Sequence, residues 1–324
     1  MNPIDLLRQN LLSPMVLCFA LGCIARLLKS DLRLPESVYA ALSTYLLFAI
    51  GLKGGVALSN YSVMSIIHPV VATLILGFVI PVLAFSFCRY LGRMKIADAA
   101  AIAAHYGSVS AVTFIASLVF LQSAGEDYEG YLPALVAILE IPAIVVGLFM
   151  ARSEMGKGKS AGAVLHEIVT GKSIVLLAGG MAVGWLTKEQ GYESVKPFFV
   201  APFQGVLCLF LLDMGLLAAS KLRDLREVGV FLVLFALSAP ILNGALGVLL
   251  GHWSGLSTGG ATVLGAMAAS ASYIAAPAAV RLALPQANPS YYLTSAIGIT
   301  FPFNLALGLP MYYSMAQIVA GWGW

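Results

Sequence analysis

The chain has 324 residues, of which 60% are hydrophobic and only 10% are charged. Soluble domains carry about 25% charged residues. This composition, with its repeated runs of about 20 apolar residues, excludes an ordinary soluble protein and predicts an all-α polytopic membrane protein in the lipid bilayer. The formal net charge of +3 is too small to indicate a nucleic-acid partner.

Ten apolar segments follow one another along the chain, and each is long enough for a membrane-spanning helix. Proline and glycine inside several of them are tolerated where neighbouring helices cover the freed backbone groups. The expected spans are residues 12–29, 37–59, 66–91, 96–121, 131–151, 171–188, 197–219, 227–250, 257–283 and 290–318.

The longest internal polar stretch, residues 151–170, divides these spans into two sets of five. We expect a first repeat in residues 1–155, a cytoplasmic linker in residues 156–170 and a second repeat in residues 171–324. Because each repeat has an odd number of spans, the two insert with opposite topology, which is typical of secondary transporters. Gene duplication in a channel or a membrane enzyme is the alternative.

Basic residues collect in alternate loops. If the first loop, with Arg26, Lys29 and Arg33, lies in the cytoplasm, alternation places most of the 18 lysine and arginine residues on that side. The opposite loops are neutral or acidic, as at residues 126–129. The positive-inside rule then predicts a multi-pass protein of the bacterial inner (plasma) membrane with both termini in the periplasm.

A short polar interruption occurs twice, at residues 106–113 in the fourth span and 268–275 in the ninth. If both helices break there, two half-helices begin near the bilayer midplane with free N–H groups and partial positive charge. Their serines can cap these ends and donate hydrogen bonds to a small anion. Small-residue helix contacts are the alternative. The predicted substrate site comprises Gly107, Ser108, Val109, Ser110, Ala269, Ser270, Ala271 and Ser272.

Glu140 lies deep in the fifth span and is followed by Pro142. An acidic residue at that depth indicates function by default, and carboxylate, hydroxyl and carbonyl oxygens together suit sodium. A proton-carrying Glu140 and a purely structural one are the alternatives. The predicted sodium-binding residues are Glu140, Thr113, Tyr273, Thr300 and Asn304.

Other polar residues in the spans predict structural roles. Lys53 and Asp213 occupy near-equivalent places in the two halves, so we expect an intramembrane ion pair with a structural or gating role, and a substrate contact is the alternative. His105 adjoins the first break, and a lone histidine there is expected to be a satisfied interior residue; a pH sensor or a substrate contact is the alternative. We expect no cofactor, no transition-metal site and no catalytic residues, and therefore a protein that is not an enzyme.

Four stretches together resemble a known family. They are Gly107-Ser108-Val109-Ser110, Ala268-Ala269-Ser270-Ala271-Ser272, Glu140-Ile141-Pro142-Ala143 and Pro285-Gln286-Ala287-Asn288-Pro289-Ser290. Over nearly its whole length the chain resembles the sodium-dependent bicarbonate transporters first described in cyanobacteria.

The resemblance implies ten helices in two inverted five-helix repeats, with broken fourth and ninth helices that bind bicarbonate and sodium. It also implies a homotrimer, in which a domain carrying the site moves against a scaffold domain. Family members are regulated by a PII-like protein, an interaction that no particular residue here supports. The anion role falls on Gly107, Ser108, Ser110, Ser270 and Ser272.

Two positions depart from the family pattern. Tyr273 and Glu140 each stand where we expect an aspartate, and the loss of the first carboxylate leaves the sodium requirement open. The sequence predicts a secondary active transporter that imports bicarbonate, or a similar small anion, coupled to sodium by alternating access. An uncoupled anion channel and a sodium-coupled carrier of a small organic anion are the alternatives.

Overall fold

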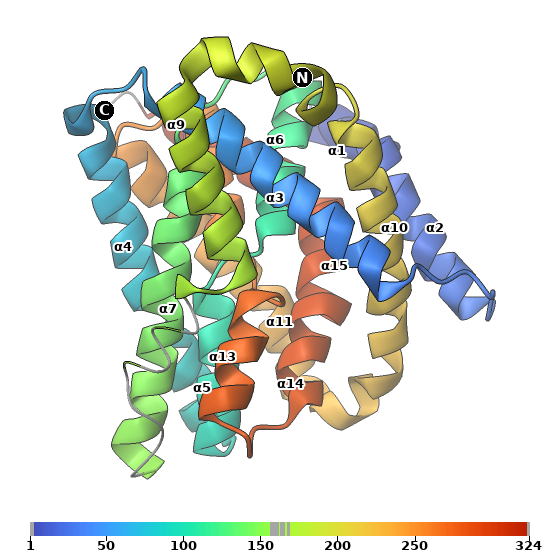
Figure 1. Ribbon diagram of the computed structural model, residues 1–324. Helices are drawn as coiled ribbons and strands as arrows, with labels where there is room; N and C mark the ends of the chain where they lie inside the picture. Colours follow the sequence, from blue (N-terminus) through green and yellow to red (C-terminus); the bar gives the residue numbers. More distant parts are fainter. Residues whose placement is uncertain (1–2, 156–161, 163–165, 167–168, 323–324) are drawn as a thin grey trace.

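Figure 1 presents the computed structural model, which describes residues 3–155, 162, 166 and 169–322. Within these residues the regular elements are all helical. Most of the predicted linker, residues 156–170, lies outside them. In chain order the elements are α1 (Pro3–Leu11), α2 (Pro14–Leu27), α3 (Glu36–Leu58), α4 (Val63–Ser86), the π-helical turn η1 (Phe87–Leu91), α5 (Ile96–Gly107), α6 (Ala111–Ala124), α7 (Leu132–Met155), α9 (Lys172–Phe199), α10 (Phe203–Lys221), the 3-10 turn η2 (Leu222–Asp224), α11 (Leu225–Trp253), α12 (Thr258–Ala268), α13 (Ala275–Ala283), α14 (Pro289–Leu293), the π-helical η3 (Thr294–Thr300), α15 (Phe301–Phe303), the π-helical η4 (Asn304–Gly308) and α16 (Leu309–Ala320).

Six helical segments within the described residues are long and apolar enough to cross a membrane, and a bent pair of helices at the N-terminus can form a seventh. Every predicted span coincides with one helix or with consecutive helical elements. The protein is therefore an all-helical, multi-pass membrane protein, whereas ten crossings stay a prediction. The six segments are Glu36–Leu58, Met64–Leu91, Ile96–Ala124, Phe203–Lys221, Val228–Trp253 and Pro289–Ala320.

Two helices differ from the predicted spans in their course. The first span is preceded by α1, which meets α2 at an angle of 56°. The bend arises because the Ser13 hydroxyl accepts a hydrogen bond from the Val16 N–H at 3.3 Å and so begins a new helix. The predicted sixth span ends at Lys188, where α9 has a non-helical residue with φ 53°. Beyond it the helix continues to Phe199 and turns across one end of the bundle (Figure 1).

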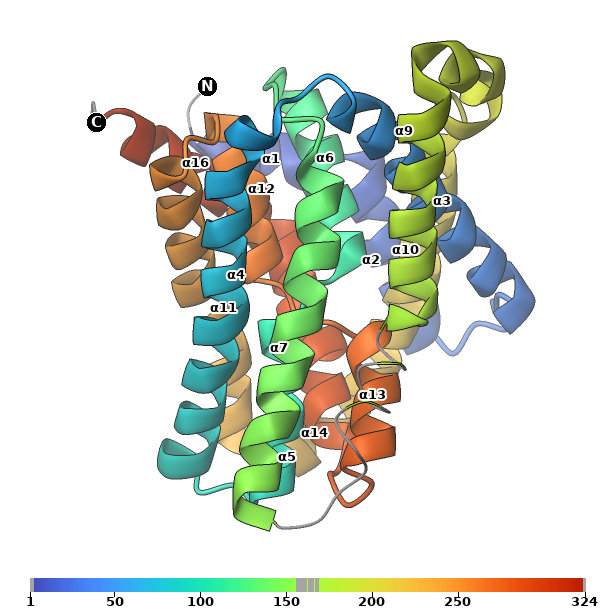
Figure 2. The ribbon, with the colours of Figure 1, turned by 60° about the vertical axis from the view of Figure 1, so that its left-hand side comes forward.

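The helices form two packed groups (Figure 2). In one group α3 lies against α9 and α2 against α10, and the other contains α4, α5, α6, α7, α11, α12 and α16. Glycines bring the first group's backbones close together, because a Cβ at Gly184 would collide with the carbonyl oxygen of Leu52. A Cβ at Gly22 would meet the carbonyl oxygen of Leu212 in the same way. Such small-residue contacts are typical of helix packing in membranes.

The connections alternate between the two ends of the bundle (Figures 1 and 2). One end of the bundle has the α3–α4, α6–α7 and α11–α12 connections together with α1 and α16. Asn10 holds α1 there by donating hydrogen bonds to the carbonyl oxygens of Leu305 and Ala306 at 2.9 Å each. The α4–α5, α10–α11 and α13–α14 connections lie at the opposite end, which carries Arg93 and Lys95.

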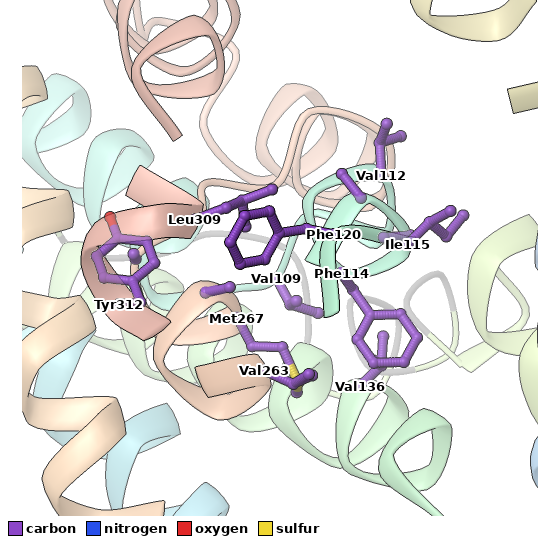
Figure 3. Packing of buried hydrophobic residues seen from close by; sticks show 14 of the residues in the cluster. Val109, Val112, Phe114, Ile115, Phe120, Val136, Val263, Met267, Leu309 and Tyr312 are labelled. Atoms are coloured by element: carbon purple, nitrogen blue, oxygen red, sulfur yellow. The ribbon is translucent and has the colours of Figure 1, made fainter. Parts of the chain in front are cut away.

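Apolar packing surrounds the middle of the second group (Figure 3). Val112 and Phe114 of α6 belong to one buried cluster with Val263 and Met267 of α12 and Leu309 of α16. Because lipid is as apolar as these side chains, close packing rather than a hydrophobic driving force holds such helices together. The cluster fixes α6 and α12 beside each other, and both of these helices end or begin at a predicted break.

Candidate functional site

The first break lies between α5 and α6. Helix α5 ends at Gly107, Ser108 is extended with φ −89° and ψ 168°, and α6 begins at Ala111. The Ser110 hydroxyl caps α6 by accepting a hydrogen bond from the Thr113 N–H at 3.2 Å. A Cβ at Gly107 would come within 2.7 Å of the Pro81 ring of α4, so the small residue there makes room for a neighbouring helix.

The second break repeats this arrangement between α12 and α13. Helix α12 ends at Ala268 and α13 begins at Ala275. The Ser272 hydroxyl accepts a hydrogen bond from the Ala276 N–H at 3.2 Å. Ser272 is the sequence equivalent of Ser110, and each hydroxyl bonds to the first turn of the helix that follows its break.

The two breaks bind each other directly. The Ser110 N–H donates to the Ser270 hydroxyl at 2.8 Å, and the Ser272 N–H donates to the His105 carbonyl oxygen at 2.8 Å. The Ser270 hydroxyl in turn donates to the Met267 carbonyl oxygen at 2.8 Å. From this point α6 and α13 run toward opposite ends of the bundle (Figures 1 and 2), so the partial positive charges of their N-termini face a common region.

A cavity of about 10 Å³ lies beside this junction. That volume holds about one water molecule, so a single small ion fits and an anion of several heavy atoms does not. Glu140 is 3% exposed, and its Oε2 has no hydrogen-bond partner among the described residues. The Tyr273 hydroxyl faces Ser110 without a hydrogen bond of good geometry. The cavity is lined by Val109, Ser110, Ala111, Glu140, Ser272, Tyr273 and Ile274.

Further polar atoms near the breaks lack partners among the described residues. They are the hydroxyl oxygens of Ser108 and Thr113 and the Nε2 atom of His105. The His105 Nδ1–H donates to the Ala101 carbonyl oxygen at 2.6 Å, and the ring stacks on Tyr292 at 4.3 Å between centroids. Because Nδ1 carries the hydrogen, Nε2 of the neutral ring is left as an acceptor. His105 is therefore only partly satisfied, in contrast to the expectation from the sequence.

Two of the residues predicted to bind sodium are engaged elsewhere. Thr300 donates its hydroxyl hydrogen to the Ala236 carbonyl oxygen and accepts from the Tyr106 hydroxyl, both at 2.7 Å. The side chain of Asn304 donates to the Ala269 carbonyl oxygen at 3.0 Å. Neither residue lines the cavity, which brings together Glu140 and Tyr273. Asn304 instead stabilises the second break through its hydrogen bond to Ala269.

Two tyrosines that the sequence patterns did not indicate support the site. Tyr312 donates its hydroxyl hydrogen to Asn304 Oδ1 at 2.7 Å, and Tyr292 stacks on His105. Tyrosines are frequent in apolar helices, so only the tertiary contacts distinguish these two.

The expected ion pair between Lys53 and Asp213 is absent. Lys53 Nζ lies 5.9 Å above the centre of the Tyr128 ring, in a crevice of about 220 Å³. Asp213 lines a different cavity, of about 400 Å³, together with Arg26 and Arg33. Helices α3 and α10 run in opposite directions (Figure 1). The cavity at Asp213 is lined by Glu36 and Tyr39 from the start of α3, whereas Lys53 lies near the other end of that helix.

Comparison with known proteins identifies a family for the chain. No curated protein matches the chain with significant similarity. The sequence model of one family, the Na+-dependent bicarbonate transporter superfamily, matches residues 14–317, which is nearly the whole chain. Transport, rather than catalysis, is the activity that this superfamily implies. The protein belongs to the Na+-dependent bicarbonate transporter superfamily.

Proposed function

We propose that this protein is a secondary active transporter that imports bicarbonate, or a similar small anion, by symport with sodium through alternating access. Membership of the superfamily supports the substrate and the ion. The proposed position of the ion site rests on one observation. A water-sized cavity lies against both helix breaks and is lined by Glu140, Ser110 and Ser272.

Sodium is the proposed occupant of this cavity. Carboxylate, hydroxyl and backbone oxygens are the kind of ligands that hard cations prefer. A bare carboxylate in a buried place is costly, and a cation beside Glu140 offsets that cost. The Tyr273, Ser110 and Ser272 hydroxyls supply neutral oxygens around the same space. Sodium is thus a coupling ion and not a resident cofactor.

The anion binds next to this ion, where the N-terminal ends of α6 and α13 meet. These ends offer backbone N–H groups and partial positive charge, and the Ser108 hydroxyl is free to donate. Neither break contains a lysine or arginine, so an ionised Glu140 would repel the anion unless sodium neutralised it. Because of this repulsion, the anion binds well only when sodium is bound beside it, and this dependence couples the transport of the two ions.

Transport requires the site to open to each side in turn. Cavities of about 220 and 330 Å³ lie along the boundary between the two helix groups. In the first, Lys53 of α3 faces Leu118 of α6, and in the second, Phe120 of α6 faces Leu207 of α10. Because this boundary is incompletely filled, the helix group that contains the breaks can move as a rigid body relative to the other group.

The proposed architecture is ten crossings in two inverted repeats, residues 1–155 and 171–324. Helices at all predicted spans and connections that alternate between the ends support it. With the basic end in the cytoplasm, both termini would lie in the periplasm of a bacterial inner membrane. The homotrimer and the PII-like regulator follow only from the resemblance and stay predictions.

Uptake of labelled bicarbonate into proteoliposomes tests the proposal. We expect uptake to rise with an inward sodium gradient. Uptake that is indifferent to sodium would contradict coupling and favour an uncoupled anion channel. No uptake by folded protein would contradict the substrate.

A double variant tests the position of the anion site. We expect Ser108→Ala with Ser270→Ala to abolish uptake by protein that still folds and assembles, with uptake compared at equal amounts of reconstituted protein, because the double variant removes two hydroxyls from the junction. Full activity would place the site elsewhere. Ser295→Ala is the matched control, since Ser295 is also a buried serine but does not line the cavity.

A further inference from the structure

A second polar cavity, of about 420 Å³, lies at the basic end of the bundle and away from the helix breaks. The connection between η1 and α5 forms one wall, α11 another, and the start of α14 a third. This size is in the range of small-molecule sites. The lining residues that matter here are Arg93, Lys95, Asp98, Phe231, Asn288 and Tyr291.

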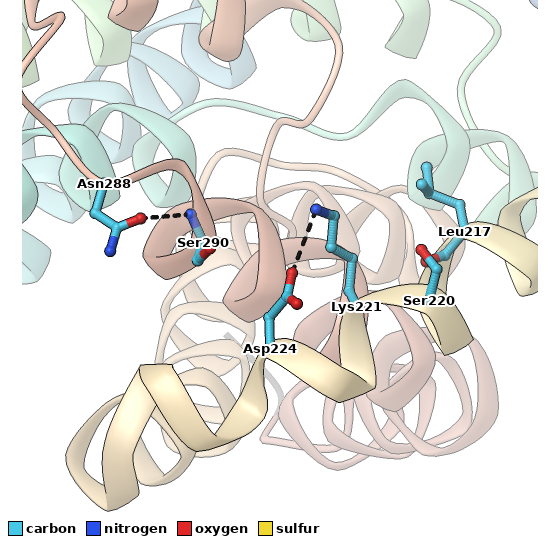
Figure 4. A network of polar contacts seen from close by, with 6 residues as sticks. All are labelled: Leu217, Ser220, Lys221, Asp224, Asn288 and Ser290. Atoms are coloured by element: carbon cyan, nitrogen blue, oxygen red, sulfur yellow. Dashed lines mark hydrogen bonds and ion pairs between the residues drawn. The ribbon is translucent and has the colours of Figure 1, made fainter.

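Two cationic side chains, Arg93 and Lys95, line the cavity. Arg93 and Lys95 are exposed and form no ion pair with any other described residue. By contrast, Lys221 at the same end lies 3.5 Å from a carboxylate oxygen of Asp224 (Figure 4). As far as the described part of the chain goes, the cavity therefore has two unpaired positive charges close to its rim.

The single carboxylate in the cavity is occupied. Asp98 Oδ1 accepts a hydrogen bond from the Asn288 N–H at 2.8 Å, and the side chain of Asn288 caps α14 by accepting from the Ser290 N–H at 3.0 Å (Figure 4). Lys95 precedes α5 and offers no side-chain cap to its first N–H groups. The uncapped start of α5 adds partial positive charge to the two cations.

The connection that bears these cations has an unusual backbone. Arg93 has φ 50°, which is uncommon for a residue with a side chain. The Arg89 guanidinium donates to the Met94 carbonyl oxygen at 3.0 Å and holds the turn. Strained residues of this kind cluster at ligand sites.

The surface beside the cavity is apolar and faces outward. Tyr90 and Leu91 of η1 are 72% and 68% exposed, and Val230 and Leu234 of α11 are 77% and 62% exposed. In a bilayer these side chains contact acyl chains. A soluble phosphate compound would use the cations alone, whereas a phospholipid would use both the cations and this surface.

We propose that the cavity binds the headgroup of an anionic phospholipid, with its acyl chains against η1 and α11. Phosphate oxygens pair with Arg93 and Lys95, as in other basic pockets between membrane helices. A bound lipid contacts both α5 and the start of α14. Helix α5 leads to the first break, and α14 follows the second break. The lipid thereby stabilises the helix group that holds the breaks, independently of what the protein transports.

Thermal stability in a lipid titration tests this site without any transport assay. The purified full chain is titrated with phosphatidylglycerol, with phosphatidylcholine and with soluble glycerol phosphate. We expect stabilisation by phosphatidylglycerol at far lower concentration than by the other two. The variant Arg93→Asn with Lys95→Gln should bind phosphatidylglycerol about thirtyfold more weakly. Asparagine accepts positive φ readily, so this variant keeps the turn.

A matched control separates the site from general surface charge. The variant Lys29→Asn with Arg33→Gln removes two cations from the α2–α3 connection, and Lys29 has φ 58°. We expect it to bind phosphatidylglycerol as the unmodified protein does. Equal weakening in both variants, or no preference over phosphatidylcholine, would overturn the proposal. If glycerol phosphate stabilised the protein as much as phosphatidylglycerol does, the cavity would bind a soluble ligand and the lipid proposal would be wrong.

Discussion

The hydrogen bond between the two breaks makes Ser270→Ala an informative substitution. The Ser270 hydroxyl is 0% exposed, accepts from the Ser110 N–H and donates to the Met267 carbonyl oxygen. Alanine leaves the Met267 oxygen with its bond from the Ser270 N–H at 3.1 Å. The buried Ser110 N–H, however, loses the one acceptor that the described residues give it.

An unpaired buried donor costs about 1–3 kcal/mol. We therefore expect Ser270→Ala to lower the free energy of unfolding by about that amount, which corresponds to a factor of about 5 to 150 in the folding equilibrium. Thermal denaturation of the detergent-solubilised protein measures the change.

Ser295→Ala is the control for this measurement. Ser295 is also 0% exposed, but its hydroxyl has no hydrogen-bond partner among the described residues. Its removal leaves no group unpaired and should change the melting temperature little. Equal melting temperatures for Ser270→Ala and Ser295→Ala would refute the argument that the two breaks hold each other.

Two further variants test the cation site and the helix packing. Glu140→Gln keeps the size of the side chain and removes its charge, so bicarbonate uptake should no longer increase with sodium. The melting temperature should not fall, because the variant removes a charge that is costly to bury. Sodium activation equal to that of the unmodified protein would show that Glu140 does not bind sodium. Gly184→Ala should destabilise the protein by about 1–3 kcal/mol through overpacking against Leu52. Gly179→Ala on the same helix, where a Cβ meets nothing within 4 Å, should be neutral or stabilise by up to about 1 kcal/mol; a similar loss of stability in both would contradict the close approach of α3 and α9.

The helix breaks could be predicted because their signal is local. Small polar residues interrupt two apolar runs, and a serine near the start of a helix can satisfy its first N–H groups. Ser110 and Ser272 do so in the structure. Glu140 was likewise evident, because a carboxylate is rare in an apolar helix.

Pairing across long sequence separations was not predictable. The Tyr106 hydroxyl meets Thr300 and the Asn304 side chain meets Ala269 only through the tertiary fold. The Lys53–Asp213 prediction was wrong because equivalent positions in sequence were assumed to meet in space. Opposed helix directions place these two residues toward opposite ends instead.

The mutual bonding of the breaks also bears on affinity. The Ser110 N–H, which could bind an anion, already has the Ser270 hydroxyl as its acceptor. An arriving anion therefore replaces one acceptor with another, so it gains less at this N–H than the about 1.5–3 kcal/mol that a hydrogen bond to a charged group contributes. A junction whose backbone groups already bond within the protein binds its substrate weakly and releases it quickly. Such a junction suits an abundant substrate and rapid turnover better than scavenging at trace concentrations.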